Sequence, residues 1–203
     1  MTNSEEKESI TPQERSTYRP CLVVLAGLPI SGKSTIGNEL AKRTNIVFLD
    51  SDLARLEVFG ESRARLDDLG ELFAMQTAYQ RNHEKARDIS LEGRPVAVAA
   101  TYSRELYHEM IKDLASRMNV PMKFFLLDPD LSQEEVKARI KGRIEEEAGN
   151  LSNMRSYDHF LSIKKRYMVI PDVDVTRINT KLPVEVCIKQ IQENLQDLRQ
   201  NSY

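Results

Sequence analysis

The segment with the clearest chemical content is the nine-residue stretch GLPISGKST at 27–35, which fits the phosphate-binding pattern G-x-x-x-x-G-K-[ST]. Gly27 and Gly32 let the backbone curl until successive N–H groups point inward at an anion. Lys33 can reach the β- and γ-phosphates of ATP, and the Ser34 hydroxyl can bind Mg²⁺. We therefore predict that ATP and Mg²⁺ bind here. The residues of this phosphate loop are Gly27, Leu28, Pro29, Ile30, Ser31, Gly32, Lys33, Ser34 and Thr35.

The flanking segments distinguish this motif from an ordinary strand-to-helix turn that happens to contain two glycines. The apolar run 22–26 (LVVLA) before it is typical of a buried parallel strand. Residues 34–44 after it predict a helix, whose N-terminus would add partial positive charge beneath the phosphates. Strand, glycine loop and helix in this order are the context that the motif requires.

Two carboxylates, Asp50 and Asp52, follow the second predicted strand at 46–49. A carboxylate at that place can accept the proton of an attacking hydroxyl or hold Mg²⁺ through water. The structural alternative is helix capping by Ser51 or Asp52. Arg55, one turn further on, can bind substrate or lie in solvent. We predict Asp52 as the catalytic base, and Asp50 and Arg55 as substrate-binding residues.

Arg139 and Arg143 are four residues apart in a helix predicted after the fourth strand, so they share one helix face. Two guanidiniums on a mobile cover would neutralise the charge that develops during phosphoryl transfer. The alternative is a solvated charged face. We predict a helical lid at about 132–157, opened by a Ser132–Glu135 capping box. The basic run Lys164-Lys165-Arg166 is more typical of solvated surface.

Strand and helix patterns alternate five times, which predicts an α/β fold with a five-stranded parallel sheet covered on both faces. In open sheets of this kind, ligands bind beyond the carboxyl ends of the strands, which adds Thr101 to the predicted substrate-binding residues. The helix predicted at 62–91 has a possible break at Gly70. Strands are expected at 20–26, 46–49, 95–100, 122–127 and 173–178, with helices at 34–44, 62–91, 104–118, from 132, at 157–167 and from 183.

Residues 1–19 are polar, charged and without periodicity, so we predict a flexible tail before a single domain at 20–203. The net charge of −2 supplies no general attraction for nucleic acid, which stays a possible but not favoured partner. The two cysteines are expected to be buried and reduced. No stretch approaches the roughly 20 apolar residues that span a bilayer, and the N-terminus is no signal peptide. We expect a cytoplasmic protein that does not bind membranes.

The chain resembles the P-loop kinases grouped around polynucleotide 5′-kinase, zeta toxin, chloramphenicol phosphotransferase and gluconate kinase. The resemblance covers about 21–198 and rests on GLPISGKST, FLDSDLAR, AATYSREL, VKARIKGR and VTRINTKLPVEVCIKQI. It implies a three-layer P-loop NTPase fold with Asp52 as general base and Arg55 orienting substrate. It also implies that Arg139 and Arg143 contact ATP phosphates, and that the segment from Asn179 to Lys181 lies near the adenine.

One position departs from the kinase pattern. Relatives often carry an aspartate at the end of the third strand, in a run like VDAT, where this chain has Ala99. That acid would help to hold Mg²⁺, and Asp50, Asp52 or Asp128 could substitute for it. The change keeps open the possibility of an ATP-binding regulatory or toxin-like protein without transferase activity.

Two other nucleotide-binding classes fit less well. A GTPase would need N/T-K-x-D, and Thr180-Lys181-Leu182-Pro183 lacks the aspartate. A remodelling ATPase would need consecutive acids after a strand, whereas Asp128 stands alone before Pro129. We therefore predict a kinase that moves the γ-phosphate of ATP to a hydroxyl of a small-molecule or nucleotide acceptor. The sequence does not indicate which acceptor it is, or the oligomeric state.

Overall fold

The computed structural model describes residues 17–60, 68–145 and 156–200. Its centre is one sheet in the order β2-β3-β1-β4-β5, and every neighbouring pair is parallel. All five residues of β1 and of β3 are buried, as their continuous apolar character predicts. The predicted parallel α/β sheet is confirmed. The strands are β1 Leu22–Ala26, β2 Val47–Asp50, β3 Val96–Ala100, β4 Met122–Leu127 and β5 Val175–Ile178.

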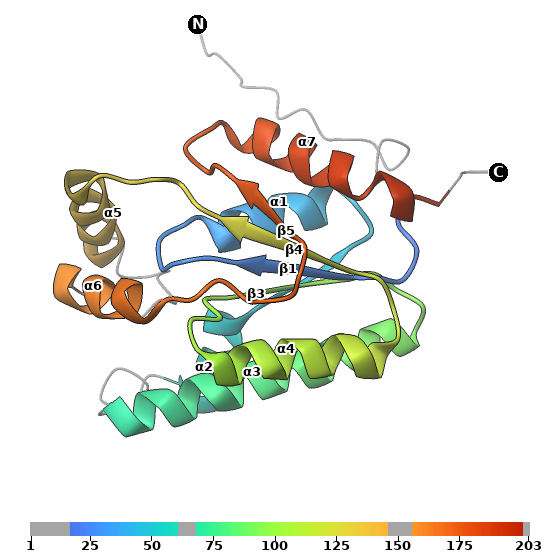
Figure 1. Cartoon of the computed structure of the whole chain (residues 1–203), viewed down its shortest axis with the longest axis horizontal. Helices are drawn as coiled ribbons and strands as arrows, with labels where there is room; N and C mark the ends of the chain where they lie inside the picture. Colours follow the sequence, from blue (N-terminus) through green and yellow to red (C-terminus); the bar gives the residue numbers. More distant parts are fainter. Residues whose placement is uncertain (1–16, 61–67, 146–155, 201–203) are drawn as a thin grey trace, which may run out of the picture.

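Helices cover both faces of the sheet, and two more lie beyond the carboxyl ends of its strands (Figure 1). One face packs against α1 (Lys33–Arg43) and α7 (Val184–Asn194). The other packs against α3 (Asp68–Leu91) and α4 (Glu105–Met118). The remaining elements are α2 Ser51–Phe59, α5 Gln133–Glu145, α6 Tyr157–Arg166 and the 3₁₀ turn η3 Gln196–Leu198.

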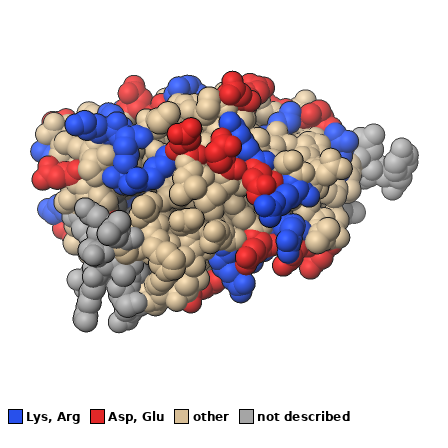
Figure 2. Space-filling view, turned by 60° about the horizontal axis from the view of Figure 1, so that its bottom comes forward, with Lys and Arg blue, Asp and Glu red and all other residues tan. Residues whose placement is uncertain are grey.

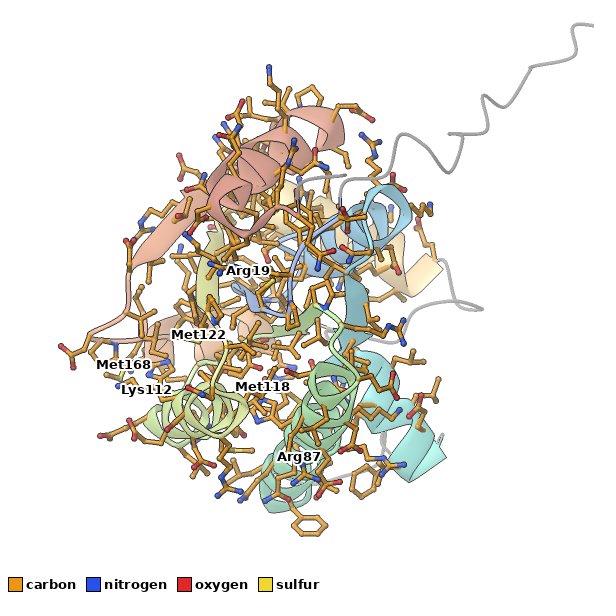
Figure 3. All side chains as sticks on the ribbon, turned by 90° about the vertical axis from the view of Figure 1, so that its right-hand side faces the viewer. Arg19, Arg87, Lys112, Met118, Met122 and Met168 are labelled. Carbon is orange, nitrogen blue, oxygen red and sulfur yellow. The ribbon has the colours of Figure 1, made fainter. Side chains whose placement is uncertain are left out.

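The alternation of side chains along β1 divides the core between the two faces. Val23 and Leu25 join the cluster beneath α1 and α7, and Val24 joins the cluster beneath α3 and α4. Figure 3 views the sheet from the end opposite the phosphate loop, where Arg19 precedes β1 and Met122 begins β4. The phosphate loop, Asp50 and Thr101 lie at the opposite edge, where β1, β2 and β3 end.

Gly37 allows α1 to lie close against β2. A Cβ at this position would overlap the ring of Phe48, which packs beside the core. The close approach places the start of α1 beside the end of β2. It therefore brings the phosphate loop next to the carboxylates that follow β2.

The predicted helix at 62–91 needs correction. The described part begins at Asp68 and continues without interruption through Gly70 to Leu91, so Gly70 does not break it. Tertiary packing offsets the cost of about 1 kcal/mol for a glycine inside a helix. Residues 62–67 lie outside the described part of the chain.

The predicted flexible tail extends too far toward the domain. Tyr18 is fully buried, forms an antiparallel bridge with Arg199, and exchanges two hydrogen bonds with Asn45 at 2.8 and 3.0 Å. Residues 17–19 therefore belong to the packed domain, because the tyrosine ring extends its core. Residues 1–16 lie outside the described part.

The two cysteines are buried and free of disulfide bonds, as expected. Across the described helices, none has the length and apolar composition needed to cross a membrane.

Candidate active site

A cavity of about 340 Å³ opens at the carboxyl ends of the strands. We call it the central cavity. The phosphate loop, the end of β2, α3, the β3–α4 connection, α5 and α6 all contribute to its lining. The fold thus brings together residues from distant parts of the chain that the sequence predicted separately. The predicted site residues that line it are Pro29, Ile30, Gly32, Lys33, Ser34, Asp50, Asp52, Arg55, Thr101 and Arg143.

The phosphate loop has the backbone conformation that its glycines permit. Gly27 has φ +153°, and a Cβ there would lie 2.5 Å from the carbonyl oxygen of Leu127. Gly32 has φ +88° and forms the N-cap of α1, so the first N–H groups of that helix face the loop. Ile30 also adopts a left-handed conformation, with φ +63°. This geometry suits a backbone that wraps an anion.

Lys33 lies against the loop that it follows. Its Nζ donates hydrogen bonds to the carbonyl oxygens of Gly27, at 3.1 Å, and Leu28, at 2.9 Å. Burial lowers the pKa of Lys33 to about 8, and the carboxylates of Asp52 and Asp50 oppose that decrease. The ammonium is therefore held at the loop by the dipoles of these two carbonyl groups. A bound phosphate would offer it full negative charges in their place.

Asp50 joins the phosphate loop to the carboxylate segment. Its Oδ2 accepts a 2.5 Å hydrogen bond from the Ser34 hydroxyl, and its Oδ1 accepts one of 2.8 Å from the Asp52 N–H. The second bond makes Asp50 the N-cap of α2, so the suggested caps Ser51 and Asp52 are wrong. The sequence assigned Asp50 to substrate, but its direct partner is the hydroxyl expected to bind Mg²⁺.

The Ser34–Asp50 pair fits a magnesium site. Mg²⁺ prefers oxygen ligands and is usually held by one or two carboxylates together with substrate phosphates. Asp50 is also the β-sheet partner of Ala99, so an acid stands one strand away from the position where kinase relatives often carry theirs. Asp128, another suggested substitute, instead pairs with Arg177 at 3.1 Å. Within the described residues, no three His, Cys, Asp or Glu side chains gather as a metal cluster.

Asp52 is paired with Arg55 inside the central cavity. The Arg55 guanidinium donates to Asp52 Oδ1 at 3.0 Å and lies 3.2 Å from the Met75 sulfur. Arg55 is 4% exposed, so the solvated alternative is wrong. Burial raises the pKa of Asp52 and the neighbouring Asp50 adds to the rise, whereas Arg55 opposes it. A carboxylate with a raised pKa in a cleft suits proton abstraction from a hydroxyl.

The two predicted lid arginines have different surroundings. Arg139 donates a 3.0 Å hydrogen bond to the carbonyl of Ile30, whereas Arg143 lines the central cavity and its charge acts on Lys33 and Asp52. A cluster of Ile30, Val136, Ile140, Phe160 and Ile163 joins the loop to α5 and α6.

The helix predicted to begin at Ser132 is confirmed at its start. The capping box is present, with Ser132 N–H donating to Glu135 at 2.7 Å and Glu135 N–H donating to Ser132 at 3.2 Å. Residues 146–155 of the predicted lid lie outside the described part.

Asn179 and Lys181 do not line the central cavity. Asn179 accepts a hydrogen bond from the Lys181 N–H at 3.0 Å, and Lys181 pairs with Glu135 of α5 at 3.0 Å. Thr180, between them, donates a 2.7 Å hydrogen bond to the Ser31 carbonyl, and a Cβ added at Gly32 would lie 3.8 Å from its side chain. The segment thus packs against the phosphate loop through a residue that the sequence did not single out.

Thr101 is positioned by buried aromatic side chains. Its N–H donates to the Tyr79 hydroxyl at 3.2 Å, and Tyr79 packs against Tyr102 and Tyr107 with ring centroids 5.2 and 4.7 Å apart. These rings hold the β3–α4 connection at the cavity wall.

Sequence reasoning missed most of the α6 contribution. His159, Ser162, Ile163 and Arg166 line the cavity, and Arg166 is also exposed, as its place in the basic run predicts. Their spacing of three, four and seven residues marks one helix face, and this was the signal available. The spacing predicts that these residues share one face of the helix, but it does not predict which part of the protein that face packs against.

Comparison with known proteins assigns the chain to a family. A family model described as AAA domain matches residues 22–161, more than two thirds of the chain and all the predicted catalytic residues. The chain belongs to this AAA domain family. No curated protein matches the sequence.

Solved structures similar to the chain share its P-loop NTPase-like α/β fold. A candidate kinase from Chloroflexus aurantiacus has a TM-score of 0.68 at 17% identity, over 89% of this chain and 98% of that one. The APS kinase of Mycobacterium tuberculosis, in complex with AMPPNP and APS, has a TM-score of 0.61 at 18% identity, over 88% and 99%. A gluconokinase from Sinorhizobium meliloti has a TM-score of 0.58 at 15% identity, over 87% and 96%. At these identities the likeness establishes the fold.

Proposed function

We propose that this AAA domain protein is an ATP-dependent phosphotransferase that moves the γ-phosphate of ATP to a hydroxyl of a small-molecule or nucleotide acceptor. The observation that carries the proposal is the convergence of Lys33, the Ser34–Asp50 pair and the Asp52–Arg55 pair on one cavity. The names of the similar structures support it, because they include a gluconokinase and an APS kinase in complex with AMPPNP and APS.

Different residues of the chain would bind the phosphates of ATP and the acceptor. Lys33 and the phosphate loop N–H groups would bind the β- and γ-phosphates, with Ser34 and Asp50 holding Mg²⁺. Mg²⁺, when bound, neutralises charge on the phosphates. Asp52 would accept the proton of the attacking hydroxyl at a carboxylate oxygen, while Arg55 orients it. Arg143 would face the charge that develops on the transferring group, and Arg139 would hold α5 against the loop.

The segment that contains Asn179 and Lys181 would border the adenine. It packs on the outer side of the phosphate loop through Thr180 and reaches α5 through Lys181, so a base bound between them would be held by both elements. Thr101 would contact the acceptor, because it lines the cavity beside Asp52 and Arg55.

The decisive experiment measures ADP formation with ATP and Mg²⁺ against a panel of sugars, sugar acids, nucleosides, 5′-hydroxyl oligonucleotides and aminoglycoside or amphenicol antibiotics. Transfer of labelled γ-phosphate to a panel member would establish the activity, and the same assay on Asp52→Asn would test the base. AMPPNP binding without transfer to any compound would support the alternative of an ATP-binding regulatory protein, which Ala99 keeps under consideration.

A further inference from the structure

Two guanidiniums that line the central cavity have no part in the proposed transfer. Arg104 is the N-cap residue of α4, and Arg166 is the last residue of α6. Within the described ranges 17–60, 68–145 and 156–200, neither has a carboxylate partner. The two residues come from helices on different sides of the cavity, one beneath the sheet and one beyond the strand ends (Figure 1).

Among the described residues, the lining of the cavity holds three carboxylates against five lysine and arginine side chains. Asp50 accepts from Ser34, Asp52 pairs with Arg55 at 3.0 Å, and Glu71 lies 3.9 Å from the His159 ring. Lys33 and Arg143 flank the phosphate loop, where ATP supplies negative charge. The positive charge of Arg104 and Arg166 is therefore surplus to the cavity and to the nucleotide, which favours an anion.

One buried aromatic residue shares the cavity wall with the two guanidiniums. Tyr107 is 3% exposed and lines the cavity. Burial raises its pKa, and the charges of Arg104 and then Arg166 oppose that rise. Arg104 and Arg166 are exposed residues from different helices, and both line the cavity wall that Tyr107 also lines.

An unpartnered hydroxyl lies beside this pair. Ser103 is 6% exposed, lines the cavity, and its side chain has no hydrogen-bond partner within the described chain. The start of α4 adds backbone donors, because no side chain caps it. The Ser103 hydroxyl opens on the cavity without a protein partner in the described chain, and Arg104 and Arg166 have no carboxylate partner there, so these donors are available to a ligand acceptor.

We propose that the phosphate acceptor carries an anionic group, a carboxylate or a phosphate, and that Ser103, Arg104 and Arg166 bind this group. This inference rests on the proposed function, because it takes the occupant of the cavity to be the acceptor. The predicted substrate class is a small hydroxylated anion, whose hydroxyl faces Asp52 while its charged group faces the two arginines.

A small acceptor fits better than a nucleic acid. The cavity volume of about 340 Å³ is at the lower end for ligand pockets. Figure 2 shows Lys and Arg side chains at the end carrying α5 and α6, with acidic side chains interrupting them across the middle of the molecule. A polymer would need a basic track that continues beyond the cavity.

The test is calorimetric titration of the full-length protein saturated with AMPPNP and Mg²⁺, so that the phosphate loop is occupied. The probes are inorganic phosphate and two matched pairs: ribose 5-phosphate with ribose, and glycerate with glycerol. A 5′-hydroxyl oligothymidine tests the polymer alternative. The variants are Ser103→Ala, Arg104→Gln and Arg166→Gln. The controls are Lys165→Gln and Arg117→Gln, which neutralise exposed cations on the same helices that do not line the cavity.

We expect wild type to bind at least one anionic probe about tenfold or more tightly than its neutral counterpart. Arg104→Gln and Arg166→Gln should each remove about tenfold of that affinity, while the controls change it by less than about twofold. In transfer assays the same variants should raise the acceptor KM and leave kcat and the KM for ATP nearly unchanged. Circular dichroism melting verifies that each variant is folded.

Three outcomes would overturn the inference: neutral and anionic probes binding equally, including no binding by either; arginine variants that behave like the controls; or the oligonucleotide as the only bound anion. The proposed function is judged separately. A probe that binds through the arginines but never receives phosphate supports the anion subsite and counts against the transferase.

Discussion

The Ser34 hydroxyl donates a 2.5 Å hydrogen bond to Asp50 Oδ2. This bond joins the start of α1 to the last residue of β2. The same carboxylate caps α2 through its other oxygen, at 2.8 Å from the Asp52 nitrogen. Asp50 therefore sets the position of Asp52 relative to Ser34. The proposed metal site and the proposed base are built on one side chain.

Replacing Asp50 separates its two roles. Asp50→Asn keeps a good N-cap but removes the negative charge, so we expect normal folding and about a tenfold higher Mg²⁺ concentration for half-maximal turnover. Asp50→Ala should lose about 1 kcal/mol of stability as well. Thermal unfolding and Mg²⁺ titration of activity measure the two effects. An unchanged Mg²⁺ requirement in Asp50→Asn would remove Asp50 from the metal site.

Replacing Asp52 tests the base. Asp52→Asn should lower kcat by about 100-fold or more, because proton abstraction contributes on that order, while the AMPPNP affinity stays within about twofold. The matched control is Glu57→Gln, an exposed acid on the same helix that pairs with Lys85. If both variants keep the wild-type kcat, Asp52 is not the base.

Arg55 should tune the pH dependence. Its charge opposes the burial that raises the pKa of Asp52, so Arg55→Met should raise that pKa further. The base must be deprotonated to act, and the acidic limb of the kcat profile should therefore move to higher pH. Arg55→Lys retains the positive charge and should move the limb less. A limb that stays in place or moves to lower pH would contradict this account.

Lys33 should take up a proton when nucleotide binds at alkaline pH. Its pKa of about 8 in the free protein leaves it largely neutral above that pH. Phosphates favour the charged ammonium, so at about pH 9 binding should absorb up to about one proton, and at about pH 7 almost none. Calorimetry in buffers of different ionisation enthalpy measures the uptake. Lys33→Met should abolish it, and equal uptake at both pH values would refute the assignment.

Gly37 should be intolerant of a side chain. A Cβ there overlaps the Phe48 ring, so Gly37→Ala should destabilise the fold by about 1–3 kcal/mol despite the better helix propensity of alanine. Urea unfolding measures the change. Phe48→Leu in the same chain should recover part of the loss, and additive effects of the two substitutions would contradict direct contact.

The phosphate loop and the order of the five strands could be predicted from sequence because each is local, whereas the helix α2 at Ser51–Phe59 was not among the expected helices. Residue types at fixed spacing decide the curl of Gly27 and Gly32, and continuous apolar runs decide which strands are buried. The capping box at Ser132 was readable for the same reason, since both of its hydrogen bonds span three residues. The boundary of the tail could not be predicted from sequence, because Tyr18 is buried by contacts with Asn45 and Arg199, which are distant in the sequence.

Only the tertiary structure decided which side chains share the site. Helix periodicity put Arg139 and Arg143 on one face, but packing of α5 against the loop gave one the Ile30 carbonyl and the other the cavity. Arg104 and Arg166 are 62 positions apart in the chain and carry no motif. Their shared place in the cavity lining depends on how α4 and α6 pack around the sheet. A sequence pattern records short spacings, whereas such an encounter is set by the sum of many packing contacts between distant segments.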